Sequence, residues 1–445
     1  MRKLVCIALG LILSALILFG WLAFAGRKPL SAAWVSLPDG TSVRILGTTY
    51  GTNHLFGTPL ARVIARLPMR LQDVAQGLLG PRFVPAQMTS TPTPQFLVWL
   101  ERSPSGGAPG TGYFEALLSN GSNFISGEDV FLQPAPFAAQ IQPVRFTVFP
   151  RRDPEINLVL FFHDQAGIRL CAAIRFANPF HRNYPQWKPE PLPAVRNAGD
   201  LQVTLRKLET GHNDSQNTQF NRDGSHATTY GTNITDGRNY TVIENVLRPL
   251  ANTNDVWQIA GVEISDATGN CSANTSMSWG SDTGSLGFMP SLWPEESAWK
   301  VKLLIKRTAG FKPEELFSFR KVPLGQLGQT NLVGWTTNVE GISITLQSIC
   351  WRAPFNNTSW SSSQLSSVKF THATLPACTQ LDLLEMVCDS GKTNHSESWS
   401  SSSNERSYSF REIPTNSQTA DFFFAIQTSR TVEFTVKPRL PGANP

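Results

Sequence analysis

One pattern recurs three times along this chain, at residues 114–179, 262–323 and 383–438. Each copy begins with an apolar run that holds a glutamate and continues into a polar turn that contains glycine. An aromatic residue and a proline follow, and the copy closes on an alternating run that ends in a second proline. Alternating short runs separated by turns indicate β-strands, and the spacing is too long for a solenoid, whose repeats are about 20–50 residues.

We therefore predict a mainly β fold with three tandem antiparallel β-sandwich domains, Ig-like or jelly-roll-like, that follow an N-terminal transmembrane helix. Duplication explains the recurrence, and chance similarity between β patterns is the alternative. A proline-rich stretch at residues 178–195 is typical of a stiff linker and gives the first domain boundary. The predicted organisation is a signal anchor at 1–28, sandwiches at 29–190, 191–325 and 326–440, and a tail at 441–445.

The first sandwich is expected to carry a helical insertion near residues 58–79. Thr58 is a good N-cap, and Pro59 suits the first helical turn. Apolar residues follow at helical spacing, namely Leu60, Val63, Ile64 and Leu67. We expect this helix to pack on the end of the first sandwich. The alternative is a membrane-surface or partner-binding helix whose basic face is Arg62, Arg66 and Arg70.

The N-terminus gives the strongest indication of class. Leu4–Ala25 is an uncharged, mostly apolar run after Met1-Arg2-Lys3. At 1.5 Å per residue it is long enough to cross the hydrocarbon core of a bilayer. We predict an uncleaved signal anchor, with the bulk of the chain outside the cytoplasm, in the periplasm or on the cell surface. A signal cleaved after Ala25, which would release a secreted protein, is the alternative.

Composition agrees with an exported β protein. Charged residues make up 16% of the chain, and the formal net charge is +5. Lys and Arg are scattered along the sequence, whereas a nucleic-acid groove needs them gathered on one face. We therefore expect no nucleic-acid partner. Gly, Pro, Ser, Thr and Asn are abundant, as in turn-rich β structure.

The sequence contains none of the common catalytic motifs, such as a GxSxG elbow, HExxH or a Walker loop. The seven histidines stand apart, without the spacing of metal ligands. Two turns, at residues 266–269 and 389–391, could offer oxygens to calcium, but aspartates that bond their own turns are the simpler interpretation. We therefore predict no cofactor and no catalytic residues, and favour a protein that is not an enzyme.

The third predicted sandwich holds Cys350, Cys378 and Cys388, half of the six cysteines. A disulfide within this set is a hypothesis that suits an exported protein, and buried free thiols are the alternative. The spacing does not choose among the three pairs. Five cysteines follow the apolar run, so at least one is free or pairs between chains.

Three tryptophans lie in loops rich in Ser, Gly and Asn, namely Trp279, Trp360 and Trp399. Exposed aromatic rings among small polar residues are typical of surfaces that stack on sugars or contact proteins. We predict these tryptophans as ligand-contact residues for a glycan or protein. The alternative is that they fill the ends of the sandwiches.

The apolar N-terminal run, the segment RILGTTYGTNHLFGTPLARVIARLP at 44–68 and the turn FPRRDPE at 149–155 carry a resemblance. Together they resemble uncharacterised membrane-anchored exported proteins of environmental bacteria, of verrucomicrobial type. The resemblance covers mainly the first 180 residues. It implies a bacterial exported protein and brings no activity or site residues with it.

The sequence thus predicts a membrane-tethered extracytoplasmic β-sandwich protein with a binding, adhesive or scaffolding role. One alternative is a carbohydrate-active enzyme or other hydrolase whose site lies between sandwiches. Another is a self-assembling envelope component that uses free strand edges or an unpaired cysteine. The sequence does not determine the oligomeric state.

Overall fold

The computed structural model of this chain is mainly β, with several antiparallel sheets and two short α-helices in the part that it describes. The predicted span from Leu4 to Ala25 and the tail at 441–445 lie outside that part. Within it, no helix has the length and apolar character needed to cross a bilayer. The described residues are 33–37, 40, 42–79, 85–103, 113–119, 124–132, 140–164, 167–211, 214–220, 226–232, 240–251, 254–274, 285–352, 365–376, 378–396, 398–401, 404–411 and 413–439.

The first strand group comprises β1–β8 in one antiparallel sheet of order β1-β2-β3-β6-β5-β4-β7-β8. A single residue pair, Glu128 with Arg145, joins β5 to β6, so the sheet divides naturally into two four-stranded halves. The strands are β1 (Val35–Ser36), β2 (Ser42–Phe56), β3 (Gln87–Arg102), β4 (Tyr113–Ser119), β5 (Phe124–Leu132), β6 (Gln140–Phe146), β7 (Glu155–Asp164) and β8 (Gly167–Ala177).

The helical insertion near 58–79 is confirmed, and it consists of two helices, α2 (Pro59–Ile64) and α3 (Met69–Leu79). The Thr58 hydroxyl accepts a hydrogen bond from the backbone N–H of Ala61 at 3.2 Å, as an N-cap should. Leu60 and Ile64 are buried against the first strand group, whereas α3 has no buried residue. The insertion therefore packs only through its first helix.

The second strand group comprises β9–β17 together with the last strand of the chain, β27. Its sheets have the orders β16-β13-β10-β9 and β15-β14-β17-β27, with β11 and β12 as a separate hairpin. The strands are β9 (Ala194–Ala198), β10 (Leu201–Gly211), β11 (Asp214–Phe220), β12 (His226–Thr232), β13 (Tyr240–Pro249), β14 (Val256–Asp266), β15 (Cys271–Asn274), β16 (Ser285–Pro290), β17 (Trp299–Ala309) and β27 (Arg430–Val436).

The third strand group comprises β18–β26, after a short 3₁₀ turn at Pro313–Glu315. Its sheets have the orders β18-β26-β22-β23 and β19-β20-β21-β25-β24. The strands are β18 (Leu316–Pro323), β19 (Thr330–Val339), β20 (Ile342–Cys350), β21 (Ser366–His372), β22 (Thr379–Cys388), β23 (Thr393–Asn394), β24 (Ser398–Ser401), β25 (Glu405–Phe410) and β26 (Thr419–Thr428).

All three strand groups share one spatial order of strands. The half-sheet β5-β4-β7-β8 of the first group corresponds to β15-β14-β17-β27 in the second and β23-β22-β26-β18 in the third. In the first group, β8 follows β7 directly along the chain. In the other two the equivalent edge strands are exchanged: β18, which follows β17, pairs with β26, and β27, which follows β26, returns to pair with β17.

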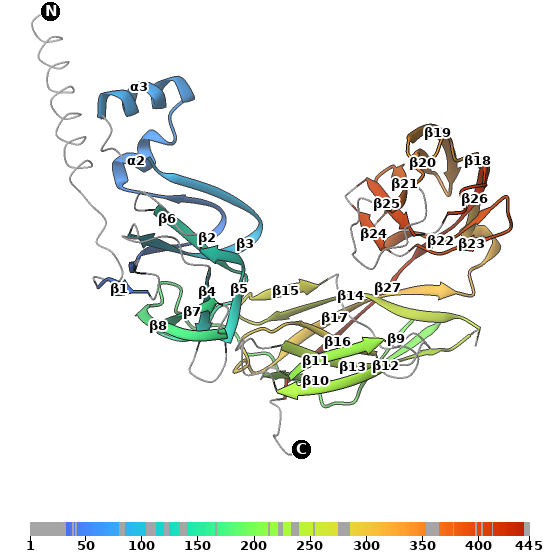
Figure 1. Cartoon of the computed structure of the whole chain (residues 1–445). Helices are drawn as coiled ribbons and strands as arrows, with labels where there is room; N and C mark the ends of the chain where they lie inside the picture. The colour runs from blue at the N-terminus through green and yellow to red at the C-terminus, as the bar shows by residue number, and fades with distance from the viewer. Residues whose placement is uncertain are drawn as a thin grey trace, which may run out of the picture.

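This reciprocal strand exchange departs from the domain boundary predicted at 325/326. Residues 430–436 belong to the sheet of the second strand group, and residues 316–323 belong to the third. Figure 1 shows β27 in the second strand group, next to β17, although β26, which precedes it in the sequence, belongs to the third group. The second group lies between the first and the third (Figure 1).

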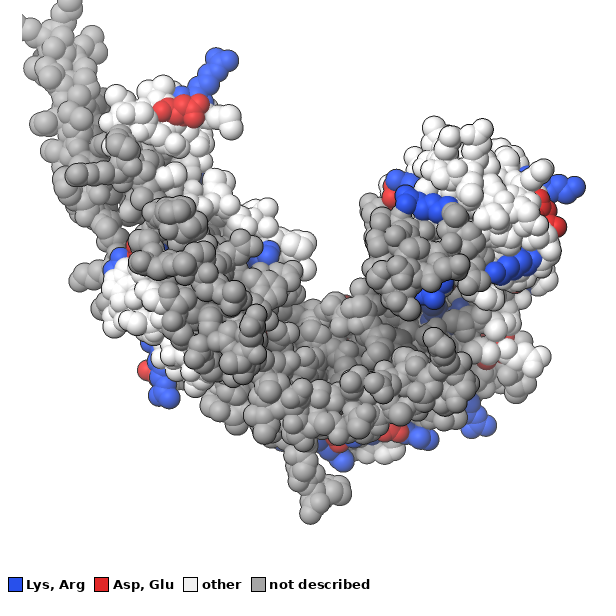
Figure 2. All heavy atoms as spheres, in the orientation of Figure 1, with Lys and Arg blue, Asp and Glu red and all other residues white. Residues whose placement is uncertain are grey.

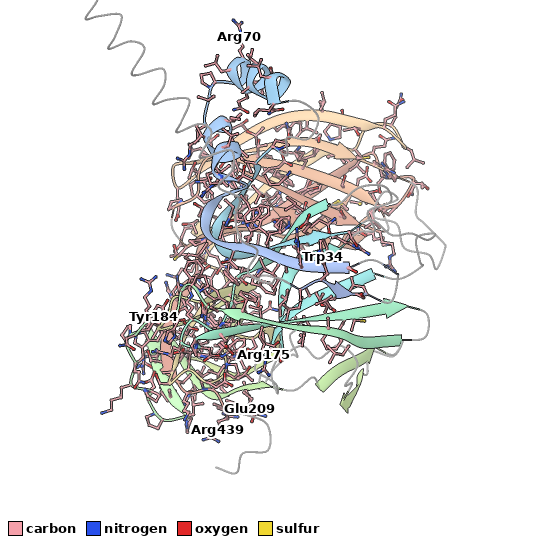
Figure 3. All side chains as sticks on the ribbon, turned by 90° about the vertical axis from the view of Figure 1, so that its left-hand side faces the viewer. Trp34, Arg70, Arg175, Tyr184, Glu209 and Arg439 are labelled. Atoms are coloured by element: carbon pink, nitrogen blue, oxygen red, sulfur yellow. The ribbon has the colours of Figure 1, made fainter. Side chains whose placement is uncertain are left out.

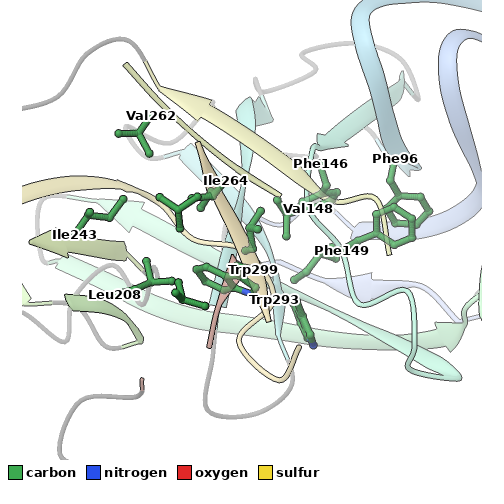
Figure 4. Close-up of a cluster of buried hydrophobic side chains, with 14 of the residues drawn as sticks. Phe96, Phe146, Val148, Phe149, Leu208, Ile243, Val262, Ile264, Trp293 and Trp299 are labelled. Atoms are coloured by element: carbon green, nitrogen blue, oxygen red, sulfur yellow. The ribbon is translucent and has the colours of Figure 1, made fainter. Parts of the chain in front are cut away.

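Buried residues form two large clusters. One is continuous through the first and second strand groups and includes Phe96, Phe149, Trp293 and Trp299 (Figure 4). The other lies within the third group. Strand β17 illustrates how its sheet contributes to the core. Along β17 buried residues alternate with more exposed ones, so one face of the strand packs on the core.

Candidate functional site

A pocket of about 240 Å³ lies where the second and third strand groups meet. Its residues come from β17 and the segment after it, from β22, from β25 and from the segment after β23. They are Lys306, Arg307, Thr308, Phe311, Asp382, Leu383, Leu384, Ser396, Arg406 and Tyr408.

The strand exchange builds this pocket. Beside the pocket, the side-chain amide of Gln427 at the end of β26 pairs with the backbone of Arg307 near the end of β17. The amide oxygen accepts from the Arg307 N–H at 2.9 Å, and the amide nitrogen donates to the Arg307 carbonyl at 2.5 Å. Gly310, at a φ of +80°, then turns the chain toward the third group. A β-carbon there would collide with Asp255, so glycine is required.

Arg307 is held in place by two carboxylates. Its side chain is buried and lies 2.5 Å from the Glu315 carboxylate and 3.9 Å from that of Asp255. It also donates to the Gly310 carbonyl at 3.1 Å, and its guanidinium lies over the ring of Trp257 at 5.5 Å. The charge of Arg307 is therefore neutralised within the joint, and Arg307 forms a fixed wall of the pocket.

The polar groups of the opposite wall centre on Asp382. Its Oδ1 pairs with Lys306 Nζ at 2.9 Å, and both side chains are largely buried. Its Oδ2 is buried and has no hydrogen-bond partner among the described residues. Arg307 Nε is likewise buried and has no partner among them. These are two of several such atoms in the described residues, and both belong to lining residues of this pocket.

Tyr408 is the third polar element of the pocket. Its hydroxyl donates to the Leu381 carbonyl at 3.2 Å and accepts from the Leu383 N–H at 3.3 Å. Burial raises the pKa of Tyr408 to about 12, and the negative charge of Asp382 adds to this effect. The tyrosine therefore stays neutral near pH 7 and fixes the start of β22 beside the pocket.

This arrangement suits recognition of a polar, uncharged or zwitterionic molecule. Lys306, Arg307 and Arg406 supply donors, and Asp382 supplies an acceptor. Phe311 and the leucines of β22 supply apolar surface, so the lining mixes both characters as ligand sites do. Asp382 is the one carboxylate among the described lining residues.

Nothing that the structure describes places the predicted ligand-contact tryptophans in this pocket. Trp279 and Trp360 lie outside the described residues. Trp399 lies in β24, where its backbone pairs with that of Tyr408. A role for these three residues therefore stays a prediction.

The hypothesised disulfide is not formed in the structure, where the thiols of Cys350, Cys378 and Cys388 are all free. Cys388 ends β22, and Cys378 directly precedes that strand. A strand of this length holds them roughly 30 Å apart, whereas a disulfide needs Cα atoms within about 7 Å. Cys350 ends β20 in the other sheet of the group, half-buried.

The two candidate calcium turns bond to the protein itself. Asp266 Oδ1 accepts from the Thr268 N–H, the Thr268 hydroxyl and the Asn270 N–H at 2.7–3.1 Å. Asp389 Oδ2 accepts from the N–H groups of Gln418 and Thr419 at 2.9 and 3.0 Å. Among the described residues, no group of three metal-ligating side chains converges.

The turn after β14, which includes Asn270, joins the first two strand groups. Asn270 is fully buried, accepts from the Phe149 N–H at 3.2 Å and donates to the Phe149 carbonyl at 3.0 Å. Arg152 in the same FPRRDPE segment forms a forked ion pair with the buried Glu296. Burial raises the pKa of Glu296, against the opposing effect of Arg152. This segment is therefore structural.

No protein-family model matches this chain, and a search of curated proteins finds no match. The junction pocket is therefore interpreted from its own geometry. Sequence patterns did not single out its residues, because Lys306 lies on an ordinary alternating strand and Asp382 in another, distant part of the chain. Only the exchange of β18 and β27 brings them together.

Proposed function

We propose that this protein is a membrane-tethered extracytoplasmic binding protein built from three tandem β-sandwich domains. The shared strand order of the three groups supports duplication of one sandwich. The apolar run at residues 4–25 supports the tether and the export, with a cleaved, secreted form as the alternative. The ligand would bind at the junction pocket between the second and third sandwiches.

The observation that carries the binding role is the incomplete hydrogen bonding around Asp382. One carboxylate oxygen pairs with Lys306, and the other is buried with no partner among the described residues. A ligand hydroxyl that donates to this oxygen and accepts from a lining Arg or Lys would complete the network. Vicinal hydroxyls beside an apolar ring face are the chemistry of a sugar, and Phe311 is the aromatic residue of the lining besides Tyr408.

A glycosidase needs two carboxyl groups about 5–10 Å apart, flanking the bond to be cleaved. Asp382 has no carboxylate neighbour in the described lining, and it is tied to Lys306. These features favour binding over hydrolysis at this pocket. The adhesive or scaffolding form of the proposal uses the same site, with a surface glycan as the ligand.

The test is binding of the intact protein to an array of immobilised mono- and oligosaccharides. Replacing Asp382 with alanine removes the acceptor, and a hydrogen bond to a charged group contributes about 1.5–3 kcal/mol. We expect binding to weaken roughly 10- to 100-fold. Glu405→Ala is the matched control, because it breaks the exposed Lys369–Glu405 pair in the same strand group. Equal binding by both variants, or no saccharide bound at all, would refute the proposal.

A further inference from the structure

Helix α3 presents an apolar stripe to solvent. Leu71, Val74 and Leu78 are 52%, 59% and 84% exposed. Their spacing of three and four residues puts them on one face of the helix. Nothing in the described part of the chain covers this face, and α3 has no buried residue. An apolar stripe that a helix turns outward in this way indicates a contact with something outside the described part of the chain.

The protein holds the stripe in a fixed direction. The Gln72 side chain, on the opposite face of α3, donates to the Ala65 carbonyl at 3.2 Å and to the Leu67 carbonyl at 2.7 Å. These carbonyls lie at the end of α2, which is itself anchored by the Thr58 cap and by buried Leu60 and Ile64. The polar face of α3 is therefore bound inward, and the leucines must face out.

The charges beside the stripe identify what it contacts. Arg70 precedes the stripe at the outer end of α3 and points away from the molecule (Figure 3). Arg66 is exposed in the turn between the two helices. Asp73 is the one acidic residue of α3, and the rest of the helix surface in Figure 2 is mostly uncharged. An apolar stripe edged with arginine suits an anionic lipid surface better than a polar protein partner.

We propose that α3 lies in the interface of an anionic membrane, with Leu71, Val74 and Leu78 at the boundary between headgroups and acyl chains. This inference rests on the tether of the proposed function. Residues 26–34 separate the apolar run from β1 and extend at most about 32 Å. The tether therefore keeps the first strand group, which carries α3, beside the membrane. Arg70 would contact lipid phosphates.

The test uses the full chain reconstituted into vesicles of phosphatidylcholine and phosphatidylglycerol at three to one. An environment-sensitive fluorescent amino acid replaces Leu78 in one variant and Leu332 in another. Leu332 is the matched control, because it is a leucine on the third strand group with 79% exposure against 84% for Leu78. We expect a blue shift and several-fold weaker quenching by acrylamide at position 78 alone. Arg70→Glu should reduce both effects.

The possible results separate the α3 contact from the membrane tether. If the chain floats with the vesicles but position 78 is quenched as easily as position 332, the α3 contact is refuted and the tether stands. If the chain does not float, the tether and the inference both fail. If the blue shift at position 78 appears without lipid and grows with protein concentration, a second copy covers the stripe, and the membrane contact is overturned.

Discussion

Replacing Gln427 with alanine breaks the joint that the strand exchange creates. The Gln427 side chain is buried, and its amide forms two hydrogen bonds with the backbone of Arg307. Alanine leaves the N–H and the carbonyl of Arg307 without these partners. A buried polar group that loses its partner costs about 1–3 kcal/mol, so two such groups give a loss of roughly 2–6 kcal/mol in the free energy of unfolding.

The assay is urea denaturation of the intact chain, followed by tryptophan fluorescence. Trp257 and Trp299 report on the second strand group, and Trp335 and Trp351 report on the third. Because the third group lies between β17 and β27 in the sequence and Gln427 ties it to Arg307, unfolding of either group removes the contacts that the other makes at the joint. We therefore expect both groups to unfold in one transition, and that transition to move to lower urea in the variant.

Gln418→Ala is the control, because Gln418 is exposed and its backbone bond to Asp389 does not involve the side chain. An exposed substitution of this kind changes stability by about 0.5 kcal/mol or less. The reasoning is refuted if Gln427→Ala costs no more than this control. It is also refuted if the second and third groups unfold separately and only one of them responds.

Two further predictions concern titration and thiol chemistry. Hydrogen bonds from the backbone N–H groups of Gln418 and Thr419 lower the pKa of Asp389 below its ordinary value of 3.8. The Asp389 carboxylate therefore stabilises the fold above pH 3.8, and this stabilisation is lost as the pH falls through the lowered pKa. Asp389→Asn should therefore flatten the acid end of a stability–pH curve, and an unchanged curve would contradict this. Cys378 is exposed, whereas Cys388 is buried and its pKa is raised by that burial. A maleimide should therefore label Cys378 before Cys388, as followed by mass spectrometry. Equal labelling rates for the two cysteines would contradict the structure.

Local patterns in the sequence were enough to predict the strands and the helical cap. The alternation from Lys300 to Lys306 predicts a strand with one solvated face, and β17 has that form. Thr58 and Pro59 predict the start of α2 correctly. These features depend on neighbours in the chain, so the sequence specifies them directly.

The strand exchange could not be predicted in the same way. Strands β18 and β27 have similar alternating patterns, and each follows its preceding strand by a short connection, residues 310–315 before β18 and Ser429 before β27. Alternation shows that a strand buries one face but not which sheet it joins. The junction pocket depends on that choice, so its residues could not be found by motif or spacing.

The two joints between strand groups differ in a way that bears on where the proposed ligand would bind. At the first joint, Asn270 and Arg152 pair with Phe149 and Glu296, and these groups satisfy one another. At the second joint, the exchange holds Arg307 and Asp382 rigidly, yet leaves Arg307 Nε and Asp382 Oδ2 buried without partners among the described residues. A rigid site with open hydrogen-bonding capacity does not need to reorganise when a ligand arrives, which lowers the entropic cost of binding. The second joint therefore offers the open hydrogen-bonding capacity that the proposed binding site needs.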